Sequence, residues 1–425
     1  MLIRRKTHLP GLPSWYGVGL EIRWRLRLAG SSPAPGTISS KRGFRSGQTG
    51  KVQDLVADAF AGSNPAPRIQ LLSSMIFFFM SSTYLQNYLC DGRMDFEYMV
   101  YPDARLSFLF PAELKAVISS YSENFILRKV NGDAVIIESN RDLSEAFLRL
   151  ASAKQVFLML KDFSQIHELL LRKFRSRIGY YIPFTISILN FNENPSKAGE
   201  VIREIKEFSP WIRISLIAPQ LELRLFDDSI GVRMPVGRDI ILDRDPKYRP
   251  YAPPTAMESL LSRALVNLTR LTPGHIFLDP FCGTGSIALE AAEMGLRVIC
   301  IDINPRIVEE AKMLIREYYG HRNVDISVGD ARNLDLEDES IDGIATDPPY
   351  GICSPTYGTP LNLLYREFLS EANRVLKPNA RLVICHTPSI PLEKFALEIG
   401  FRYEYSFSMR VHSGLTRLIS VLRVR

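Results

Sequence analysis

The chain is poor in cysteine and has no apolar run long enough to cross a membrane. Its five cysteines are scattered and no two are spaced as Cys-x-x-Cys; they are Cys90, Cys282, Cys300, Cys353 and Cys385. This pattern indicates neither a disulfide framework nor a zinc site, so we expect no metal and a reducing, cytoplasmic setting. The apolar patch 75–80 is far shorter than the roughly 20 residues of a membrane span. The long basic and polar stretch before it is not the layout of a cleavable signal, so no membrane partner is expected.

Positive charge is concentrated at the start of the chain. Residues 1–74 hold 11 Lys and Arg against 3 Asp and Glu, whereas residues 75–425 hold 41 against 43. The net charge of +6 therefore does not by itself indicate a nucleic-acid-binding body. The remaining composition, 46% hydrophobic and 23% charged over 425 residues, is ordinary for a globular protein of more than one domain.

The first segment, 1–93, is expected to be a low-complexity basic extension. Glycine, serine and proline recur without sustained periodicity, which favours disorder. A near-repeat, Gly-Ser-Ser-Pro in 28–35 and Gly-Ser-Asn-Pro in 60–67, matches what the T-arm consensus of a tRNA gene encodes in one reading frame. Our hypothesis is that this segment is translated upstream sequence and that the native start is Met75, Met80, Met94 or Met99. The alternative is a basic RNA-binding arm.

Residues 94–238 mix short strand and helix patterns and predict an α+β region of two small units, 94–165 and 166–238. The second unit holds four cations in six residues beside two tyrosines, which would suit phosphate neutralisation and base stacking. These candidate RNA contacts are Arg172, Lys173, Arg175 and Arg177. A solvated helix face explains the same charges without a ligand. The proline-rich, charged stretch 239–258 is predicted to be an extended, semi-rigid linker.

A strand, a glycine turn and a helix follow this linker in succession. The strand 275–279 ends in Asp279 and runs into Pro280, Phe281, Cys282, Gly283, Thr284 and Gly285, after which 286–294 has helical spacing. Glycines let backbone approach a ligand closely, and free N–H groups at the helix start add partial positive charge. A second strand ends in Asp302, 23 residues after Asp279, close to the usual offset for an acid that binds ribose hydroxyls. A third strand, 324–328, leads to Asp330 and Ala331.

A second motif, Thr346-Asp-Pro-Pro-Tyr-Gly351, closes an apolar run. Prolines cannot extend a strand ladder, so an acid, two rigid residues and an aromatic ring stand together at the strand's carboxyl end. Such a group could hold a planar ring with an exocyclic amine. Asp347 and the Pro348 carbonyl would each accept one N–H, and Tyr350 would offer a stacking face. A proline-stiffened loop without a ligand is the simpler alternative.

The two motifs are predicted to meet in a doubly wound α/β domain, 259–425. Ligands collect at the carboxyl edge of an open parallel sheet, where the strand order reverses. If the 275–279 strand is central, the strand that ends at Asp347 lies beside it across that reversal. The last stretches, 401–411 and 417–424, alternate around Gly414 and predict an antiparallel pair, which gives a seven-stranded sheet with one reversed strand.

Together, Asp279-Pro-Phe-Cys-Gly-Thr-Gly285 and Thr346-Asp-Pro-Pro-Tyr-Gly351 resemble the class I S-adenosylmethionine-dependent amino-methyltransferases. In particular they are similar to the archaeal THUMP-domain tRNA guanine-N2 methyltransferases that act on guanosine 10. The resemblance implies a ferredoxin-like domain at 94–165, a THUMP domain at 166–238, a Rossmann-like methyltransferase domain at 259–425 and tRNA as partner. We expect a monomer. The resemblance also implies that the glycine turn and Asp279 hold the methionine part of S-adenosylmethionine, Asp302 the ribose, Asp330 and Ala331 the adenine, and Asp347, Pro348 and Tyr350 the guanine.

Alternatives remain at this stage. The same chemistry could act on another tRNA or ribosomal RNA guanosine, or on an exocyclic amine of DNA. A nicotinamide-dependent oxidoreductase also uses a glycine turn and a strand-end acid, but it leaves the Asp347 motif unexplained. The chain could instead be a non-catalytic RNA-binding scaffold, although both motifs are intact. Cys282 is better explained as a small residue of the turn than as a nucleophile. Whether one or two methyl groups are added stays open.

Overall fold

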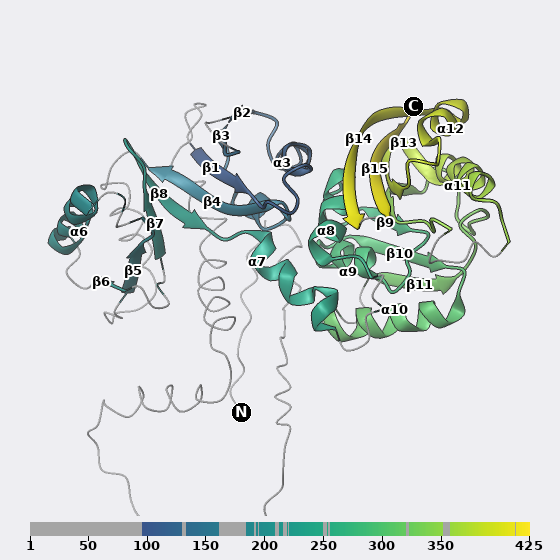
Figure 1. Ribbon diagram of the computed structural model, residues 1–425, viewed down its shortest axis with the longest axis horizontal. Helices are drawn as coiled ribbons and strands as arrows, with labels where there is room; N and C mark the ends of the chain where they lie inside the picture. Colours follow the sequence, from purple (N-terminus) through teal and green to yellow (C-terminus); the bar gives the residue numbers. More distant parts are fainter. Residues whose placement is uncertain are drawn as a thin grey trace, which may run out of the picture. The chain divides into compact units, whose positions relative to one another are not determined.

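The structure is a computed structural model (Figure 1). It describes residues 96–129, 133–160, 184–190, 193, 195–208, 212–215, 219, 221–249, 253, 256–319, 323–351, 358–412 and 414–425. The expected extension at 1–93 and the cations Arg172, Lys173, Arg175 and Arg177 lie outside these residues. In the described part, no helix is both long and apolar enough to cross a membrane.

The first half of the described chain forms one mixed sheet with the strand order β2-β3-β1-β4-β8-β7-β5-β6. The strands are β1 (Phe96–Pro102), β2 (Phe125–Lys129), β3 (Val135–Ser139), β4 (Ala153–Leu160), β5 (Phe184–Ile188), β6 (Ile212–Ile214), β7 (Leu221–Leu225) and β8 (Ile230–Met234). Three helices accompany them: α3 (Phe110–Ile118), α4 (Ser144–Phe147) and α6 (Pro195–Phe208). Strands β4 and β8 pair antiparallel, so strands from both predicted units share one sheet and one hydrophobic cluster.

The first part of the predicted extended linker, up to Tyr248, is instead helical, which corrects the expectation of an extended chain there. Helix α7 (Gly237–Ile241) continues into the 3-10 turns η2 (Leu242–Arg244) and η3 (Pro246–Tyr248). The physical reason lies in two arginines of this segment. Arg244 and Arg249 are buried and hydrogen-bond to partners outside it, which an extended, solvated chain could not do.

The second half forms a seven-stranded sheet with the order β11-β10-β9-β12-β13-β15-β14. Its strands are β9 (Ile276–Asp279), β10 (Arg297–Asp302), β11 (Val324–Val328), β12 (Ile341–Thr346), β13 (Leu376–His386), β14 (Phe401–His412) and β15 (Leu415–Val424). Strands β9 to β13 run parallel to one another, and β15 is antiparallel to both of its neighbours. The predicted fold class, a doubly wound sheet with one reversed strand, is confirmed.

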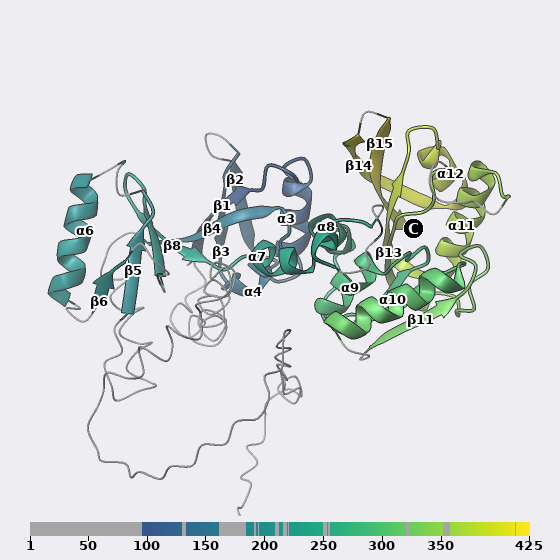
Figure 2. The same ribbon diagram turned by 60° about the horizontal axis from the view of Figure 1, so that its bottom comes forward.

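Alternating apolar residues bury both faces of this sheet. Phe277 belongs to the hydrophobic cluster that includes α8 (Ser259–Leu268) and α9 (Ser286–Glu293), whereas the next residue, Leu278, belongs to the cluster that includes α11 (Leu361–Val375) and α12 (Leu392–Ile399). Successive side chains of a strand point to opposite faces, so the two helix groups cover opposite sides (Figure 2). Helix α10 (Pro305–Tyr318) joins the first group through Ile315.

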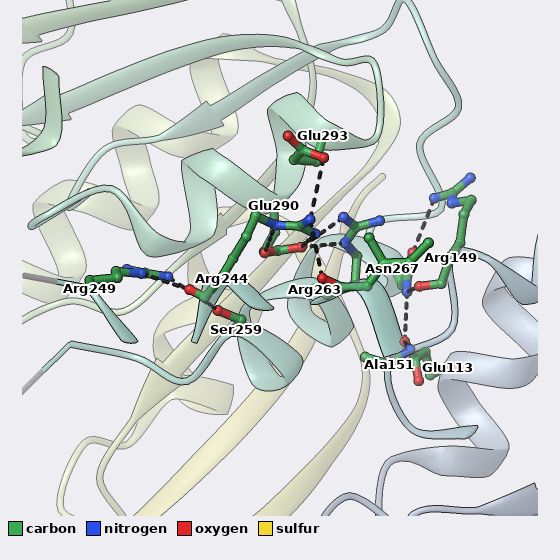
Figure 3. A network of polar contacts seen from close by, with 11 residues as sticks. Glu113, Arg149, Ala151, Arg244, Arg249, Ser259, Arg263, Asn267, Glu290 and Glu293 are labelled. Carbon is green, nitrogen blue, oxygen red and sulfur yellow. Dashed lines mark hydrogen bonds and ion pairs between the residues drawn. The ribbon is translucent and has the colours of Figure 1, made fainter. Parts of the chain in front are cut away.

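A buried polar cluster connects α3 and the segment after α4 with α8 (Figure 3). The side-chain amide of Asn267 donates to Glu113 Oε1 at 2.6 Å and to the Arg149 carbonyl at 2.8 Å. Glu113 also accepts the backbone N–H groups of Ala151 and Ser152, at 2.9 and 2.8 Å. Each of these groups would be costly to bury without a partner, so the cluster ties α8 to the first sheet's helices.

Candidate active site

The reversal of strand order places the two sequence motifs side by side. From β9 the chain moves outward to β10 and β11, then returns to β12 on the other side of β9. Strands β9 and β12 pair in parallel, with Leu278 opposite Ile344. Their carboxyl ends are joined directly, because the Thr346 hydroxyl donates to Asp279 Oδ1 at 2.7 Å. The predicted meeting of the motifs is therefore present in the fold.

Asp279 is a fully buried acid with an unused oxygen. Its Oδ1 accepts from Thr346, whereas Oδ2 has no hydrogen-bond partner among the described residues. Desolvation raises the pKa of this carboxyl to about 7, although the Thr346 hydrogen bond opposes the shift. An orphaned buried acceptor at a strand end fits a ligand that brings an ammonium group.

The glycine turn after Asp279 leaves room for a ligand. Gly283 and Gly285 have φ values of +51° and +85°, a region that side chains with a Cβ rarely adopt. A Cβ added at Gly283 would meet nothing within 4 Å, so the space beside this backbone is open. The hydrogen bond from Cys282 N to the Ile301 carbonyl, at 3.0 Å, pins the turn to β10. Cys282 itself is buried, and a hydrogen bond with Cys300 and desolvation raise the pKa of its thiol, which argues against a nucleophile.

Asp302 supports the turn from the end of β10. Its Oδ2 accepts the Gly283 N–H at 3.0 Å, and its Oδ1 accepts the Asn304 N–H at 2.9 Å. Each carboxylate oxygen can accept more than one hydrogen bond, so both keep acceptor capacity for ribose hydroxyls. The predicted ribose ligand is thus also a brace for the glycine turn, a role that sequence spacing alone did not indicate.

Asp330 lies against a cation that sequence reasoning missed. Arg332 donates to Asp330 Oδ2 at 2.6 Å and to Oδ1 at 3.0 Å, and it also reaches Thr359 Oγ1 at 3.1 Å. These hydrogen bonds lower the pKa of Asp330. The neighbouring Ala331 is buried. Their assignment to adenine stays a prediction.

Asp347 is held in a closed triangle with Tyr350 and Arg417. The Tyr350 hydroxyl donates to Asp347 Oδ1, Arg417 Nη2 lies 3.2 Å from Asp347 Oδ2, and Arg417 Nε donates to the Tyr350 hydroxyl at 2.8 Å. The guanidinium also lies 5.8 Å from the centre of the Tyr350 ring. The Asp347 side chain remains 23% exposed, whereas Pro348 is buried. Sequence reasoning found the acid and the tyrosine and missed the arginine.

Opposing effects act on the pKa of the Asp347 carboxyl. Desolvation raises the pKa of its carboxyl, and the Arg417 charge and the Tyr350 hydrogen bond lower it without cancelling the shift. The described residues contain no group of three metal-ligating side chains. What the site offers is a set of carboxylate oxygens at one edge of the sheet, suited to accepting ligand N–H and O–H groups.

Comparison with known proteins places this geometry in a class. Residues 246–419 match the family model described as "RMKL-like, methyltransferase domain". The chain is 40% identical to the tRNA (guanine(10)-N2)-dimethyltransferase of Methanothermobacter thermautotrophicus over 42% of this chain and 52% of that protein. It is 35% identical to a protein of Methanothermococcus thermolithotrophicus named "Probable tRNA (guanine(10)-N2)-dimethyltransferase", over 38% of this chain and 97% of that protein. The crystal structure of TrmN from Thermus thermophilus aligns with a TM-score of 0.43 at 21% identity, covering 78% of this chain and 100% of that one.

The sheet topology and the matched family model identify residues 246–419 as a methyltransferase domain of the doubly wound class. It belongs to the tRNA (guanine(10)-N2)-dimethyltransferase family. This membership confirms the family predicted from the two motifs and, with it, S-adenosylmethionine as the expected cofactor. The chain spans about half the length of the Methanothermobacter relative.

Proposed function

We propose that the protein transfers a methyl group from S-adenosylmethionine to the N2 amine of a guanosine in tRNA, with position 10 as the target. The observation that carries this proposal is the Thr346 to Asp279 hydrogen bond. It brings an acid suited to a cofactor ammonium and an acid suited to a nucleobase amine to the same edge of the sheet. A methyl donor and a methyl acceptor bound to these two acids would be neighbours, as an in-line transfer needs.

The cofactor side of the site fits S-adenosylmethionine. Asp279 Oδ2, buried and without a partner among the described residues, would accept the ammonium group of the methionine part. The open backbone at Gly283 would admit the chain of that part, and Asp302 would accept the ribose hydroxyls. Asp330 and Ala331 would border the adenine. When bound, this cofactor supplies an electrophilic methyl group on a sulfonium.

The acceptor side would orient a poor nucleophile. The guanine N2 lone pair is delocalised into the ring, and hydrogen bonds from N2 to Asp347 and to the Pro348 carbonyl would turn that lone pair toward the methyl group. As the new carbon–nitrogen bond forms and the carbon–sulfur bond to the methyl group breaks, Asp347 would stabilise the positive charge that develops on N2. The surplus N2 proton would then pass to the Asp347 carboxylate and on to solvent. The Tyr350 ring would hold the base by stacking once the guanosine leaves its helix.

The first half of the chain would bind the tRNA. We propose a ferredoxin-like domain at 94–165 and a THUMP domain at 166–238, with Arg172, Lys173, Arg175 and Arg177 as phosphate contacts. The linker 239–258 would connect this tRNA-binding part to the methyltransferase domain at 259–425. A cytoplasmic monomer is the form in which we expect the protein to act. Addition of one or of two methyl groups is an outcome for the assay to decide.

Nucleoside analysis tests the proposal. The full chain is incubated with tRNA transcripts and methyl-labelled S-adenosylmethionine, and the modified nucleosides are identified and mapped. The expected product is N2-methylguanosine or N2,N2-dimethylguanosine at position 10, lost when guanosine 10 is replaced by adenosine. Asp347→Ala should lose most of its activity, and Asp338→Ala, which alters an exposed acid that pairs with Arg374, should keep activity. Label in another nucleoside, or in none, would overturn the proposal.

A further inference from the structure

The reversed strand β15 contributes one charged side chain to the acceptor acid. Arg417 comes 70 residues after Asp347, and its side chain is only 12% exposed. Its fork reaches both members of the motif, with Nη2 toward Asp347 Oδ2 and Nε toward the Tyr350 hydroxyl. Because the Tyr350 hydroxyl donates a hydrogen bond to Asp347 Oδ1, each of the three side chains contacts the other two.

This triangle leaves Asp347 with directed acceptor capacity. Each carboxylate oxygen accepts one hydrogen bond within the triangle, and the Cys385 thiol donates a further one to the carboxylate. Two carboxylate oxygens offer about four acceptor sites, and the side chain stays partly exposed, so capacity for a ligand remains. A rotation of the carboxylate would break two of the three contacts together. The remaining lone pairs are therefore presented in a fixed direction at the end of β12.

The groups around Asp347 also differ in charge. Tyr350, Tyr365 and Cys385 face it with neutral side chains, and Asp279 contributes a nearby acid. Among the described residues that act on this carboxyl, Arg417 is the cation. Removing it would leave a partly buried acid with no charge to stabilise its ionised form.

We propose that Arg417 is a positioning residue for the methyl acceptor, which holds Asp347 ionised and aimed at the guanine amine and holds Tyr350 in the stacking position. This inference rests on the proposed function and adds a residue to it. An ionised carboxylate accepts hydrogen bonds only, so it favours a base edge that presents N–H donors. A protonated carboxyl would offer a donor of its own and lose that preference.

Three variants separate this role from a purely structural one. Arg417→Met removes the charge and keeps the bulk, and Arg417→Lys keeps the charge and loses the fork. Arg423→Met is the matched control, because Arg423 lies on the same strand and contacts Asn379 instead. For each protein we would measure the melting temperature, S-adenosylmethionine affinity, and kcat and KM for tRNA across pH.

The expected pattern is specific. Arg417→Met should lower kcat roughly 10²-fold with cofactor affinity unchanged. Loss of the cation raises the pKa of Asp347 further, so the ionised fraction falls at a given pH and the acid limb of the kcat profile moves to higher pH. Arg417→Lys should restore the pH profile and only part of kcat, and Arg423→Met should match the parent. A wild-type pH profile in Arg417→Met would overturn the inference.

A titration without turnover keeps this inference distinct from the proposed function. The Asp347 carboxyl carbon can be followed by ¹³C NMR, assigned by its loss in Asp347→Asn, in the parent and in Arg417→Met. A higher pKa in Arg417→Met supports the positioning role even if tRNA is not the substrate. An unchanged pKa sinks it even if the parent methylates guanosine 10.

Discussion

Glu290 and Asp347, two of the carboxylates of the methyltransferase half that pair with arginine, differ in how many hydrogen bonds they can still accept from a ligand. Glu290 on α9 is fully buried between Arg244 and Arg263, with Arg244 Nε and Nη2 each 2.9 Å from a carboxylate oxygen and Arg263 Nη2 at 2.7 Å (Figure 3). Asp347 has one arginine, one tyrosine and an exposed edge. Hydrogen bonds from the two arginines occupy the Glu290 carboxylate, whereas the Asp347 carboxylate can still accept hydrogen bonds from a ligand.

The balance of charge follows the same division. Desolvation acts on both acids and would raise both pKa values. At Glu290 the two arginines outweigh it and lower the pKa, but at Asp347 the single arginine does not. A buried acid with two cations is locked in its ionised form, and one with a single cation stays sensitive to its surroundings. Sensitivity of this kind is typical of sites that act on ligands.

The structural acid nevertheless serves the functional site. Glu290 lies one turn beyond Ser286, the first residue of α9 after the glycine turn. Arg249 of the linker donates to Ser286 Oγ at 2.8 Å, and Arg244 of the linker donates to Glu290 Oε1 at 2.9 Å. Two residues of the linker therefore contact α9, the helix that begins directly after the glycine turn. This attachment joins the first half of the chain to the cofactor side of the site.

The largest expected effect tests the structural side of the comparison. Glu290→Ala leaves two buried arginines without their shared partner and should lower the free energy of unfolding by about 3–5 kcal/mol. Urea denaturation followed by circular dichroism measures the loss. Glu293→Ala is the control, because Glu293 is more exposed and lies 3.5 Å from Arg244, and it should cost far less. If Glu290→Ala kept its stability but lost activity, Glu290 would belong with the functional acids.

The next effect tests the functional side. Asp347→Ala removes an acceptor that acts mainly as charge develops on N2, so kcat should fall roughly 10²–10³-fold while cofactor and tRNA affinities stay near normal. Single-turnover methylation and calorimetric binding separate the two effects. Near-normal turnover in this variant would show that the strand-end acid serves only the architecture, as Glu290 does.

A smaller effect is expected at Asp302, which combines both roles. Asp302→Ala removes the proposed ribose contact and the brace on Gly283, so S-adenosylmethionine affinity should fall by about 1.5–3 kcal/mol. High cofactor concentration should restore part of the rate. Titration calorimetry gives the affinity, and Asp325→Ala on the neighbouring strand β11 provides a control. A loss of kcat with unchanged cofactor affinity would contradict the assignment.

The smallest effect concerns the pH dependence of cofactor binding. Burial raises the pKa of Asp279 to about 7, and only its ionised form attracts an ammonium group. Affinity for S-adenosylmethionine should therefore rise with pH through that value, by up to about tenfold or ~1.4 kcal/mol per pH unit on the acid side. Calorimetry in buffers of different ionisation enthalpy should show proton release near neutral pH. Asp279→Asn should bind more weakly, with a flat pH dependence in this range.

Local chemistry in the sequence was sufficient to predict the strand-end acids and the glycine turn. Asp279 precedes glycines that adopt positive φ, and Asp347 precedes prolines that cannot extend a strand. Both acids can therefore be located from neighbouring residues in the sequence, without knowledge of long-range contacts. Period-2 alternation and helical spacing likewise predicted the strands 275–279, 324–328, 401–411 and 417–424 and hence the class of sheet.

Only the tertiary structure decided which cations those acids meet. Arg417 is one arginine in an alternating strand, and nothing near it in sequence marks it off from Arg423, yet the strand order brings one to Asp347 and the other to Asn379. Arg244 and Arg249 similarly read as solvated charges of a linker until Glu290 and Ser286 are packed against them. The sequence gives the sign and spacing of the charged residues. The burial of each charged side chain and the partner that it meets depend on strand pairing and helix packing between residues far apart in the chain. Long-range charge pairing is therefore what the fold added to a site whose acids the sequence already predicted.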